Sequence, residues 1–453
     1  MEKTLNVQVN VLSNDMVKPS TPTPNHLKTF DISYVDQILP LVPPFLSTGL
    51  VFYTAPPPTQ PPLDITRLKS SLSKTLSRFY PLAGRIKQST IDCNDEGLPF
   101  IETNVNCSLS SFLSLPNRLD FMPKFLPPRE SLGIVGNLGT VTELAHLAIQ
   151  VNVFTCGGLA IGWYDIHKIM DGSSSATFFK HWTALASQCY DDLIQPDFDA
   201  TVTAFPPLSK APQLQWDNGS ENHVNQKSRT VVKSFVFQSP AIAALITRAA
   251  TKLVPNPTRY LALAGFIWEH VMASKCSDFQ SNGYTDTVLQ VTLDLRPRIN
   301  PPLPRGSIGN LVNTAVARAE NPTQMKDLVV EIHEAVAKVK SEIGGYQGES
   351  AVQNVRKNWN NLINVMSDYK DRAYKLVSWS KLGFSDLDFG FGKPKWMVPT
   401  DGIMSPFHRN LIILTDYRDS QGDGIEAWFF LEEKDMDVLI SNEGFLAFAT
   451  PSY

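Results

Sequence analysis

Residues 159–172 read Leu-Ala-Ile-Gly-Trp-Tyr-Asp-Ile-His-Lys-Ile-Met-Asp-Gly, and this stretch fixes the order of elements at the centre of the chain. Its apolar first part, 159–166, follows a Gly-Gly turn and therefore predicts a buried strand. Serines 173–175 offer helix N-caps, and apolar residues at helical spacing continue to about residue 189, which predicts a helix. His167 is thus expected at the end of a strand, just before a helix.

His167 has the chemistry of a general acid and base. An imidazole near its unperturbed pKa takes a proton from an alcohol at neutral pH and returns it to a leaving group. Asp171 follows four residues later. Its carboxylate suits either the orienting group of a Ser-His-Asp triad or, on a shared helix face, a second metal ligand. No third His, Cys or carboxylate cluster accompanies the pair, so we predict a proton-transfer site without a metal.

The composition is that of a globular protein with two cores. With 453 residues, the chain is long enough for two domains of about 200 residues each. Its formal charge of -4 provides no basic surface, so we expect no nucleic-acid or membrane partner. Five scattered cysteines without a Cys-x-x-Cys pair argue against a disulfide framework or a structural zinc. The sequence contains neither a signal-peptide pattern nor an apolar run of membrane-span length, and we predict a cytoplasmic protein.

Periodicity outside the centre predicts alternating strands and helices. Apolar spacing of three and four residues indicates a helix over 65–79, and 146–154 alternates as a strand. Between them, 91–93 and 100–103 flank an Asn-Asp-Glu-Gly turn, which predicts a hairpin. In the second half we expect strands at 231–237, 287–295, 376–380, 411–415 and 425–431, and helices at 239–253, 259–274, 325–339 and 435–440.

A segment rich in Pro, Asn, Asp and Ser, 191–227, separates the two halves of the chain. Its composition buries little apolar surface and suits an exposed crossover. We therefore predict an N-terminal domain, 1–190, that carries the His167 motif, and a linker at 191–227. The predicted C-terminal domain, 228–453, carries a second motif, Asp-Phe-Gly-Phe-Gly at 388–392.

With both motifs, the chain resembles the plant BAHD acyltransferases. Members of that family have His-x-x-x-Asp-Gly in the middle of the chain and Asp-Phe-Gly-Trp-Gly near its end; here Phe391 replaces the usual Trp. Six further blocks occur in family order, which a chance match does not explain. These blocks are Pro-Thr-Pro at 22–24, Asp-Gln at 36–37, Phe-Tyr-Pro-Leu-Ala-Gly-Arg at 79–85, Asn-Pro-Pro-Leu-Pro at 300–304, Gly-Asn at 309–310 and Gly-Ile-Glu-Ala-Trp at 424–428.

The resemblance implies an α/β fold of two chloramphenicol-acetyltransferase-like domains, each with a mixed β-sheet flanked by helices, joined by a long crossover. It places His167 at the domain interface, midway along a channel that acyl-CoA enters from one face and an alcohol from the other. We therefore expect direct acyl transfer in a ternary complex, with His167 as general base and acyl-CoA as co-substrate. The expected enzyme is a monomer with no permanently bound cofactor.

The resemblance also implies supporting roles. Asp171 is expected to point away from the cavity and to pair with a downstream arginine, for which Arg296 is the matching residue, so that Asp171 braces its loop. Asp388 is expected to support activity from a distance, within a rigid loop that bears glycines. The residues assigned structural roles in this way are Arg296, Gly172, Gly390 and Gly392.

One departure concerns the hydrogen-bond donors of the reaction centre. Val377 stands where many relatives have Thr, whose hydroxyl is interpreted as an oxyanion or acceptor contact, and Val has no donor. That contact then falls to Ser378, Trp379, a backbone N–H or water. Asp-Phe-Gly also occurs in kinases, but here no Gly-rich loop with a downstream Val-Ala-x-Lys accompanies it. Serines 173–175 follow no Gly-x-Ser-x-Gly elbow, so we assign them as helix caps rather than a nucleophile.

Short blocks at 93–100, 154–158 and 382–388 most resemble the vinorine-synthase-like branch of the family. That branch commonly transfers acetyl from acetyl-CoA to hydroxyls of alkaloids and terpenoids, and this is the function that we predict. Hydroxycinnamoyl and malonyl transfer are alternatives, because pocket shape rather than the shared motifs decides the donor. A catalytically silent homologue that binds a small molecule is a further alternative. The departures at Val377 and Phe391 point to it, as does Ile166, which stands before the histidine where relatives commonly have a small or polar residue.

Overall fold

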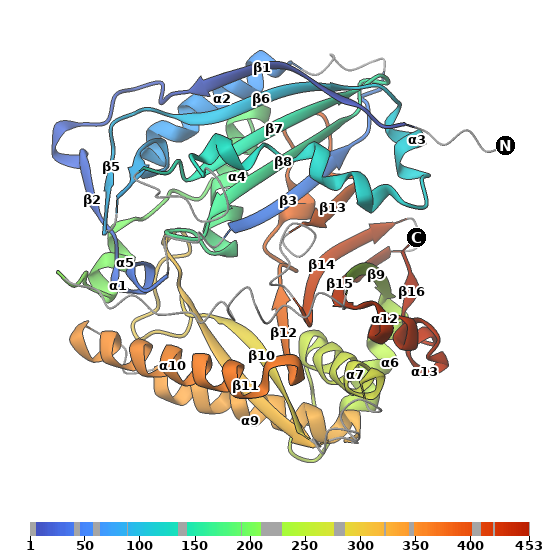
Figure 1. The fold of residues 1–453 in the computed structure, drawn as a ribbon. Coiled ribbons are helices and arrows are strands. Elements are labelled where there is room, and N and C mark those ends of the chain that lie inside the picture. The colour runs from blue at the N-terminus through green and yellow to red at the C-terminus, as the bar shows by residue number, and fades with distance from the viewer. Residues whose placement is uncertain are drawn as a thin grey trace. The chain divides into compact units, whose positions relative to one another are not determined.

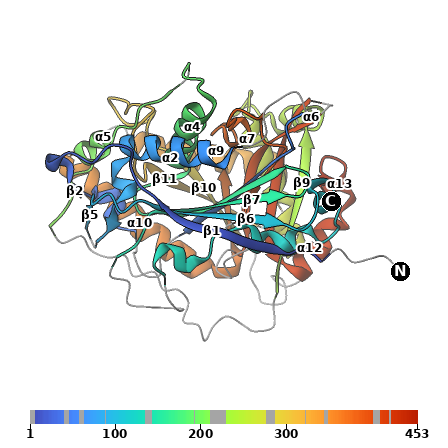
Figure 2. The same cartoon turned by 90° about the horizontal axis from the view of Figure 1, so that it is seen from above.

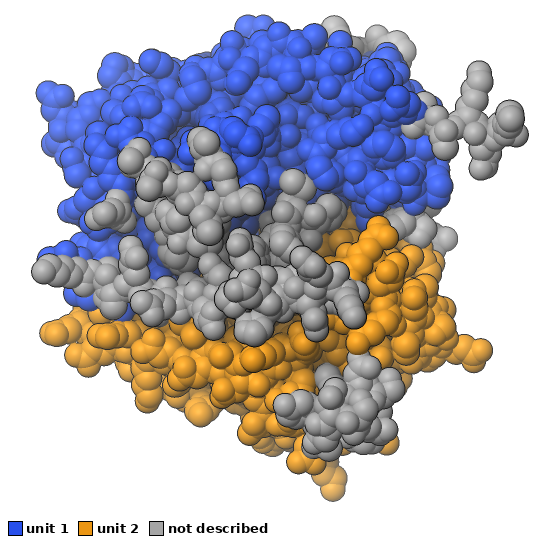
Figure 3. All heavy atoms as spheres, viewed as in Figure 1, with its two compact units in different colours: residues 1–214, 303–311, 382–404 blue, residues 215–302, 312–381, 405–453 orange. Residues whose placement is uncertain are grey.

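The chain forms two compact units (Figure 3). Unit 1 comprises Met1–Leu214, Leu303–Leu311 and Leu382–Met404, and unit 2 comprises Gln215–Pro302, Val312–Lys381 and Ser405–Tyr453. Each unit contains its own mixed β-sheet, which confirms the predicted class of two sheet-containing α/β parts. The computed structural model describes residues 6–39, 46–57, 64–87, 89–134, 143–191, 193–209, 229–275, 286–320, 323–343, 348–400, 409–419 and 422–452.

The two units are not the two continuous stretches expected from the sequence. Leu303–Leu311 and Leu382–Met404 come from the second half of the chain and belong to unit 1. The second of these segments enters the sheet of unit 1 as strand β13 (Trp396–Pro399), which pairs antiparallel with β3 (Leu46–Tyr53). The composition of the chain does not reveal that these late segments belong to unit 1, because strand pairing joins residues that are far apart in sequence. The Asp-Phe-Gly-Phe-Gly motif therefore lies in unit 1.

The segment expected to be a linker is partly structured. Residues 193–209 contain helix α5 (Asp199–Ala204), and Asp197 forms an isolated bridge with Ser307 within unit 1. The rest of the expected linker, 210–227, lies outside the described residues.

The sheet of unit 1 has six strands in the order β1-β6-β7-β8-β3-β13 (Figure 1). β6 and β7 run parallel and the other neighbours run antiparallel. β8 is buried along its whole length, as its apolar sequence predicts. The strands introduced here are β1 (Val9–Val17), β6 (Leu98–Val105), β7 (Leu147–Phe154) and β8 (Leu159–Ile166).

Helices α2 (Ile65–Arg78) and α4 (Gly172–Ser187) pack together on one face of this sheet (Figure 2). Trp182 of α4 donates its indole N–H to a backbone carbonyl of α2 at 3.1 Å. Trp163 of β8 packs on Phe179 of α4, with ring centroids 4.5 Å apart. Both helices confirm the predictions made from their apolar spacing.

Aromatic side chains cover the opposite face. Helix α3 (Leu109–Leu113) and the 3-10 helix Arg118–Phe125 carry Phe112 and Phe125, whose rings lie 5.8 and 6.1 Å from a phenylalanine ring of β3. Gly162 of β8 allows this close cover, because a Cβ there would collide with the Phe125 carbonyl. The strand that precedes His167 is therefore held between two packed layers.

A small sheet with the order β2-β5-β4 completes unit 1. The hairpin predicted over 91–103 is wrong, because β5 pairs with β2 and β4 whereas β6 pairs with β1 and β7. Asp95, in the turn between β5 and β6, accepts hydrogen bonds from Thr23 and Lys28. These bonds tie the turn to an earlier segment, and the chain then enters the large sheet. The strands are β2 (Thr29–Asp31), β4 (Arg85–Ile86) and β5 (Thr90–Asp92).

Unit 2 is built on a seven-stranded sheet with the order β11-β10-β12-β14-β15-β9-β16 (Figure 1). β10, β12 and β14 are parallel, and the remaining pairs are antiparallel. The strands expected at 231–237, 287–295, 376–380, 411–415 and 425–431 are confirmed as β9, β10, β12, β14 and β15. Their bounds are β9 (Thr230–Gln238), β10 (Asp286–Asp294), β11 (Val312–Glu320), β12 (Ala373–Ser378), β14 (Leu411–Asp419), β15 (Gly422–Glu432) and β16 (Thr450–Pro451).

Helices line both faces of this sheet. One face carries the main apolar core, to which α6, α7, α9, α12 and α13 contribute. α10 packs on the opposite face, where Val288 of β10 lies with Tyr369 and Ala373. Within the described ranges, each helix is too short or too polar to cross a membrane. The bounds are α6 (Ser239–Ala249), α7 (Arg259–Ser274), α9 (Met325–Ile343), α10 (Gly348–Tyr369), α12 (Glu433–Ile440) and α13 (Glu443–Leu446).

Candidate active site

His167 lies in the short connection between β8 and α4, as the sequence predicts. The strand is paired with β7 up to its last residue, where the Ile166 N–H donates to the His146 carbonyl at 2.8 Å. A tight turn follows, in which the Lys168 N–H donates to the Ile166 carbonyl at 2.6 Å. α4 then begins at Gly172. His167 is thereby fixed between a buried strand and a helix start.

Asp171, rather than one of the serines, is the N-cap of α4. Its Oδ1 accepts a hydrogen bond from the Ser174 N–H at 2.8 Å. Its Oδ2 accepts one from the Leu311 N–H at 3.1 Å, and the carboxylate is 1% exposed. Asp171 thus joins the start of α4 to the segment Leu303–Leu311, which belongs to the same unit.

The arginine expected to pair with Asp171 lies in unit 2. Arg296 donates from Nη1 to Asp294 Oδ1 at 3.1 Å, and its side chain is 4% exposed. The pairing of Asp171 with Arg296 stays a prediction.

Lys168 ties the same connection to the segment that follows helix α1 (Tyr34–Gln37). Its Nζ donates to the carbonyls of Gln37 at 3.2 Å and Leu39 at 2.6 Å, and the residue is 2% exposed. Burial lowers the pKa of the ammonium to about 8, against the opposing charge of Asp36. Sequence reasoning missed this contact, because lysine is ordinarily a surface residue.

Asp36 and Asn310 form a buried pair beside His167. Asp36 Oδ1 accepts hydrogen bonds from the Asn310 backbone N–H and from Nδ2, both at 2.7 Å, and Oδ2 accepts one from the Ser33 hydroxyl at 2.5 Å. Nδ2 of Asn310 also donates to the His167 carbonyl at 3.2 Å. Burial raises the pKa of Asp36 to about 6, although these hydrogen bonds and the charge of Lys168 oppose it. The Asp-Gln and Gly-Asn blocks of the sequence signalled these positions without giving them a role.

The serines after the motif are part of the helix start. The Gly309 N–H donates to Ser174 Oγ at 3.1 Å, and Ser174 Oγ donates to the Gly309 carbonyl at 3.2 Å. Ser175 donates to Asp165 at 2.8 Å. Gly309 has a φ of 148°, and a Cβ there would collide with Thr201. Both hydroxyls are therefore engaged inside unit 1, which agrees with a structural role.

The environment keeps the His167 ring in its neutral form. Burial lowers the pKa of the imidazole, whereas the charge of Asp171 and a hydrogen bond with the Asn310 side chain oppose this. Because the direction is downward from 6.5, the ring is predominantly unprotonated at pH 7. A neutral imidazole is the form that accepts a proton.

Asp388 stabilises its own loop. Its Oδ1 accepts hydrogen bonds from the N–H groups of Gly390 at 2.7 Å and Gly392 at 2.9 Å. Both glycines have positive φ, 96° and 105°, which other residues rarely adopt. Arg67 of α2 donates to the Phe389 carbonyl at 2.7 Å and was not anticipated from the sequence.

The loop around Asp388 lies against the far end of α4 from His167. Phe389 packs on Trp182, with centroids 4.7 Å apart, and Trp182 is about 16 Å along the helix from its N-cap. Phe391, which replaces the usual Trp, packs on Tyr53 with centroids 5.0 Å apart. An aromatic body is therefore retained at that position. The loop and the His167 connection are joined by a helix rather than by direct contact of their motifs.

Two other expected site residues belong to unit 2. Ser378 is the last residue of β12. Trp379 follows it, is 7% exposed and donates its backbone N–H to the Leu414 carbonyl at 2.8 Å. Their expected contact with the reacting groups stays a prediction.

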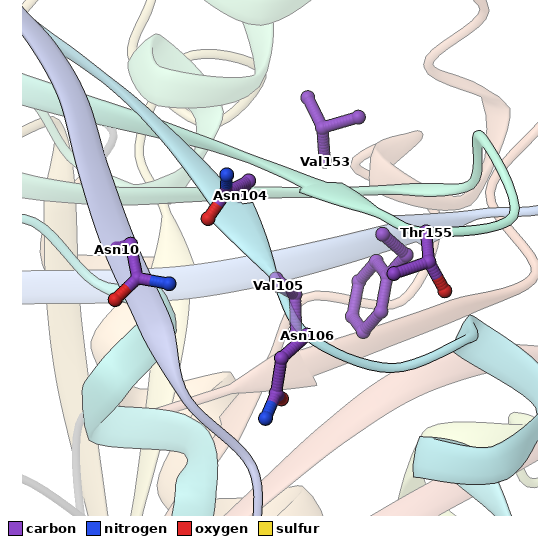
Figure 4. A pocket seen from close by; sticks show the side chains of 7 residues that line it. Asn10, Asn104, Val105, Asn106, Val153 and Thr155 are labelled. Atoms are coloured by element: carbon purple, nitrogen blue, oxygen red, sulfur yellow. The ribbon is translucent and has the colours of Figure 1, made fainter.

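A hollow of about 310 Å³ lies on unit 1 at the other end of β7 (Figure 4). β7 pairs with β8 so that Leu147 faces Asp165 and Val153 faces Leu159, which puts the hollow roughly 25 Å from His167. It is therefore separate from the His167 connection. The lining residues are Asn10, Asn104, Val105, Asn106, Val153, Phe154 and Thr155.

Solved structures share this fold. Vinorine synthase is 31% identical, with a TM-score of 0.78 over 98% of this chain and 99% of that chain. TRI101 of F. sporotrichioides, complexed with coenzyme A and T-2, has a TM-score of 0.69 over 93% of this chain and 99% of that chain, at 17% identity. The identity to vinorine synthase, over nearly the whole of both chains, shows that the two proteins are related as well as alike in fold.

Sequence comparison identifies the family to which the chain belongs. A model of the Transferase family matches residues 7–446. Stemmadenine O-acetyltransferase of Catharanthus roseus is 34% identical over 452 residues, 96% of this chain and 97% of the relative. Limonoid 21-O-acetyltransferase of Melia azedarach is 32% identical over 454 residues, 98% of this chain and 99% of the relative. The chain belongs to the Transferase family, the BAHD acyltransferases, as the motifs predicted.

Proposed function

We propose that this protein transfers an acetyl group from acetyl-CoA to a hydroxyl of an alkaloid or a terpenoid, with His167 as general base. The observation that carries the proposal is the His167 connection itself. A neutral imidazole is held at the end of β8 by three separate braces, namely Lys168, Asp171 and Asn310. A rigidly held base that is unprotonated at neutral pH can accept the proton of an alcohol.

In the proposed reaction both substrates are bound together. His167 removes the hydroxyl proton as the oxygen attacks the thioester carbonyl, and a tetrahedral oxyanion forms. When the intermediate collapses, the C–S bond breaks, the ester is complete, and His167 returns the proton to the departing CoA sulfur. No covalent enzyme intermediate is needed.

Supporting residues complete the proposal. Ser378 and Trp379 are assigned to the oxyanion or the acceptor, because Val377 offers no donor in its side chain. Arg296 is assigned as a further partner of Asp171, and Asp388 as a support that acts through its loop. Trp379→Phe keeps an aromatic ring and removes the indole donor. We expect that variant to lose turnover while it keeps its melting temperature.

The donor and acceptor classes rest on the relatives. Those quoted above are named as O-acetyltransferases of stemmadenine and of a limonoid, and the TRI101 structure contains coenzyme A. These names support acetyl-CoA as the co-substrate and a hydroxyl-bearing specialised metabolite as the acceptor. Hydroxycinnamoyl or malonyl transfer is the second candidate, because pocket shape rather than the shared motifs decides the donor.

The proposed setting is the cytosol, where the protein acts as a monomer. The cysteines Cys93, Cys107, Cys156 and Cys189 are free, which suits a reducing compartment.

Release of free CoA thiol tests the proposal. Acetyl-, malonyl- and coumaroyl-CoA are each combined with a panel of alkaloid and terpenoid alcohols, for wild type, His167→Ala and His333→Ala. His333 is an exposed histidine of α9 and serves as the matched control. We expect acetyl-CoA to be used fastest, His167→Ala to lose turnover and His333→Ala to keep it.

Two outcomes count against the proposal. Equal rates for wild type and His167→Ala would remove His167 from the mechanism. A wild-type protein that is stabilised by CoA in a thermal-shift assay, yet turns over no donor and acceptor pair, would favour a silent binding protein.

A further inference from the structure

Strand β12 carries a lysine in the interior of the unit 2 sheet. Tyr374 and Leu376 of this strand belong to the main apolar core. Because side chains alternate along a strand, Lys375 and Val377 lie on the opposite face, on which α10 packs (Figure 1). Lys375 is paired with Gln290 of β10 on one side and with β14 on the other. This position is unusual for lysine, which ordinarily lies at the surface.

Polar, partly exposed side chains accompany Lys375 on this face. Gln290 is its neighbour on β10, Thr292 lies two residues further along, and Thr314 of β11 pairs with Thr292. All four residues are partly exposed, whereas Leu411 on the other side of Lys375 is buried. Within the described part of the chain, none of these four side chains has a hydrogen-bond or ion-pair partner. We call the four residues the Lys375 patch.

The aspartates on the same face of β10 do not serve as counter-ions for Lys375. Asp286, at the start of the strand, is paired with Arg372. Asp294, at its end, is paired with Arg296 at 3.1 Å. Burial lowers the pKa of the Lys375 ammonium, and no carboxylate of the described residues opposes this shift. A partly buried charge without a counter-ion costs free energy, which an anionic ligand would offset.

Lys375 lies beside the residues assigned to the reaction centre. Val377 is two residues further along the same face of β12, about 7 Å away, and Trp379 directly follows the strand. The four-carbon stem of lysine is long enough to cover much of this distance. The charge of Lys375 therefore acts on a substrate that is bound at Trp379.

We propose that the Lys375 patch binds a carboxylate carried by one of the two substrates, with its ammonium as counter-ion and its amide and hydroxyls as hydrogen-bond donors. This inference rests on the acyl transfer proposed above and narrows the substrates. The ammonium repels a protonated amine, so that cationic alkaloids are poor acceptors. A terpenoid alcohol that bears a carboxylate, or a donor with a malonyl group, has the matching charge.

NMR titration of Lys375 tests this proposal. Reductive methylation with carbon-13 formaldehyde labels the lysines, and Lys375→Arg identifies the signal of Lys375. The probes are malonyl-CoA against acetyl-CoA, and oleanolic acid, a terpenoid alcohol with a carboxylate, against its methyl ester. We expect a probe with the carboxylate to raise the pKa of Lys375 and its partner without that carboxylate to leave the pKa unchanged, because an opposite charge favours the ammonium.

The two probe pairs separate the two sources of the carboxylate. A rise with oleanolic acid assigns the patch to the acceptor, and a rise with malonyl-CoA assigns it to the donor. If neither carboxylate raised the pKa of Lys375, the proposal would be overturned. Because the titration needs no turnover, its result stands even if the proposed acyl transfer fails.

Substrate selectivity gives the second readout, as the ratio of kcat/KM for the substrate with the carboxylate to kcat/KM for its partner. We expect Lys375→Gln to reduce this ratio about tenfold to 100-fold, because a hydrogen bond to a charged group contributes that much to binding. Lys375→Arg keeps the charge and should keep most of the ratio. Lys326→Gln is the matched control, since Lys326 is an exposed lysine of α9, on the other face of the sheet.

Thermal unfolding distinguishes ligand binding from a structural role. A lysine without a partner adds no bond to the fold, so Lys375→Gln should melt at or above the wild-type temperature. A lower melting temperature together with an unchanged selectivity ratio would show a structural lysine and overturn the proposal. If Lys375→Gln does not fold, Lys375→Met, which keeps an unbranched side chain, takes its place.

Discussion

Replacing Asp171 with Ala is expected to weaken the fold as well as the reaction. Loss of the N-cap of α4 costs about 1 kcal/mol. The buried Leu311 N–H also loses its acceptor, and an unsatisfied buried donor costs about 1–3 kcal/mol. The combined loss is about 3 kcal/mol. A unit of this size loses about 2–4 °C in Tm for each kcal/mol, so the expected decrease in Tm is about 6–12 °C.

Thermal unfolding followed by circular dichroism, together with thiol release, measures both effects. Asp64→Ala is the matched control, because Asp64 is an exposed N-cap that accepts one hydrogen bond, from the Thr66 N–H at 2.9 Å. We expect that control to lose only about 2–4 °C, since one exposed cap contributes about 1 kcal/mol. If Asp171→Ala melted at the wild-type temperature and lost only turnover, Asp171 would be a chemical participant and the brace described here would be refuted.

Three further predictions concern the same unit. Lys168→Met leaves the two carbonyls that Lys168 binds without their donor and should lower the free energy of unfolding, measured in urea, by about 2 kcal/mol. The control Lys74→Met changes an exposed lysine and should alter that free energy little. Equal effects of the two substitutions would contradict the bracing role of Lys168. Gly390→Ala forces an alanine to a φ of 96° against Arg67 and should cost more than about 1 kcal/mol; an unchanged melting temperature would contradict this. Burial lowers the pKa of His146 to about 3, so between that value and 6.5 the unfolded chain binds more protons and stability falls as the pH falls. From pH 6.5 to pH 5 this loss is about 2 kcal/mol, and His146→Phe should remove it from the measured pH dependence of unfolding.

The core of the site could be predicted because its signals are local. An apolar run of strand length, a turn residue and a helix with capping residues all lie within a few positions of His167, and each acts on its own neighbours in sequence. The choice of Asp171 over the serines as the cap could not be predicted. Both residue types cap helices well, and only the path of the backbone decides which one reaches the free N–H groups.

The partners of the His167 connection are long-range and were not assigned from the sequence. Asp36 lies 131 positions before His167, and Asn310 lies 143 positions after it. Family blocks marked both places, but a block does not say which atom binds which. Lys168 carried no signal at all, because a single lysine beside an apolar run looks like a surface residue.

Two of the missed elements, β1 and α10, have polar sequences. β1 reads Val-Asn-Val-Leu-Ser-Asn-Asp-Met-Val and is mostly exposed, so it lacks the alternation of a half-buried strand. α10 has few buried residues along its 22 positions, and its Asn- and charge-rich sequence has a weak apolar face. β13 joins unit 1 through pairing with β3, and four residues carry too little pattern to reveal that partner.

In the proposed reaction His167, held in its neutral form at the end of β8, performs the proton transfers of acyl transfer from CoA. The most direct test is kcat/KM for acetyl-CoA at pH 7 in His167→Gln against wild type, with an alcohol that the wild type accepts. General-base catalysis predicts a loss of about 10²–10⁴-fold with the fold intact by circular dichroism. Equal values in the two proteins would contradict the account.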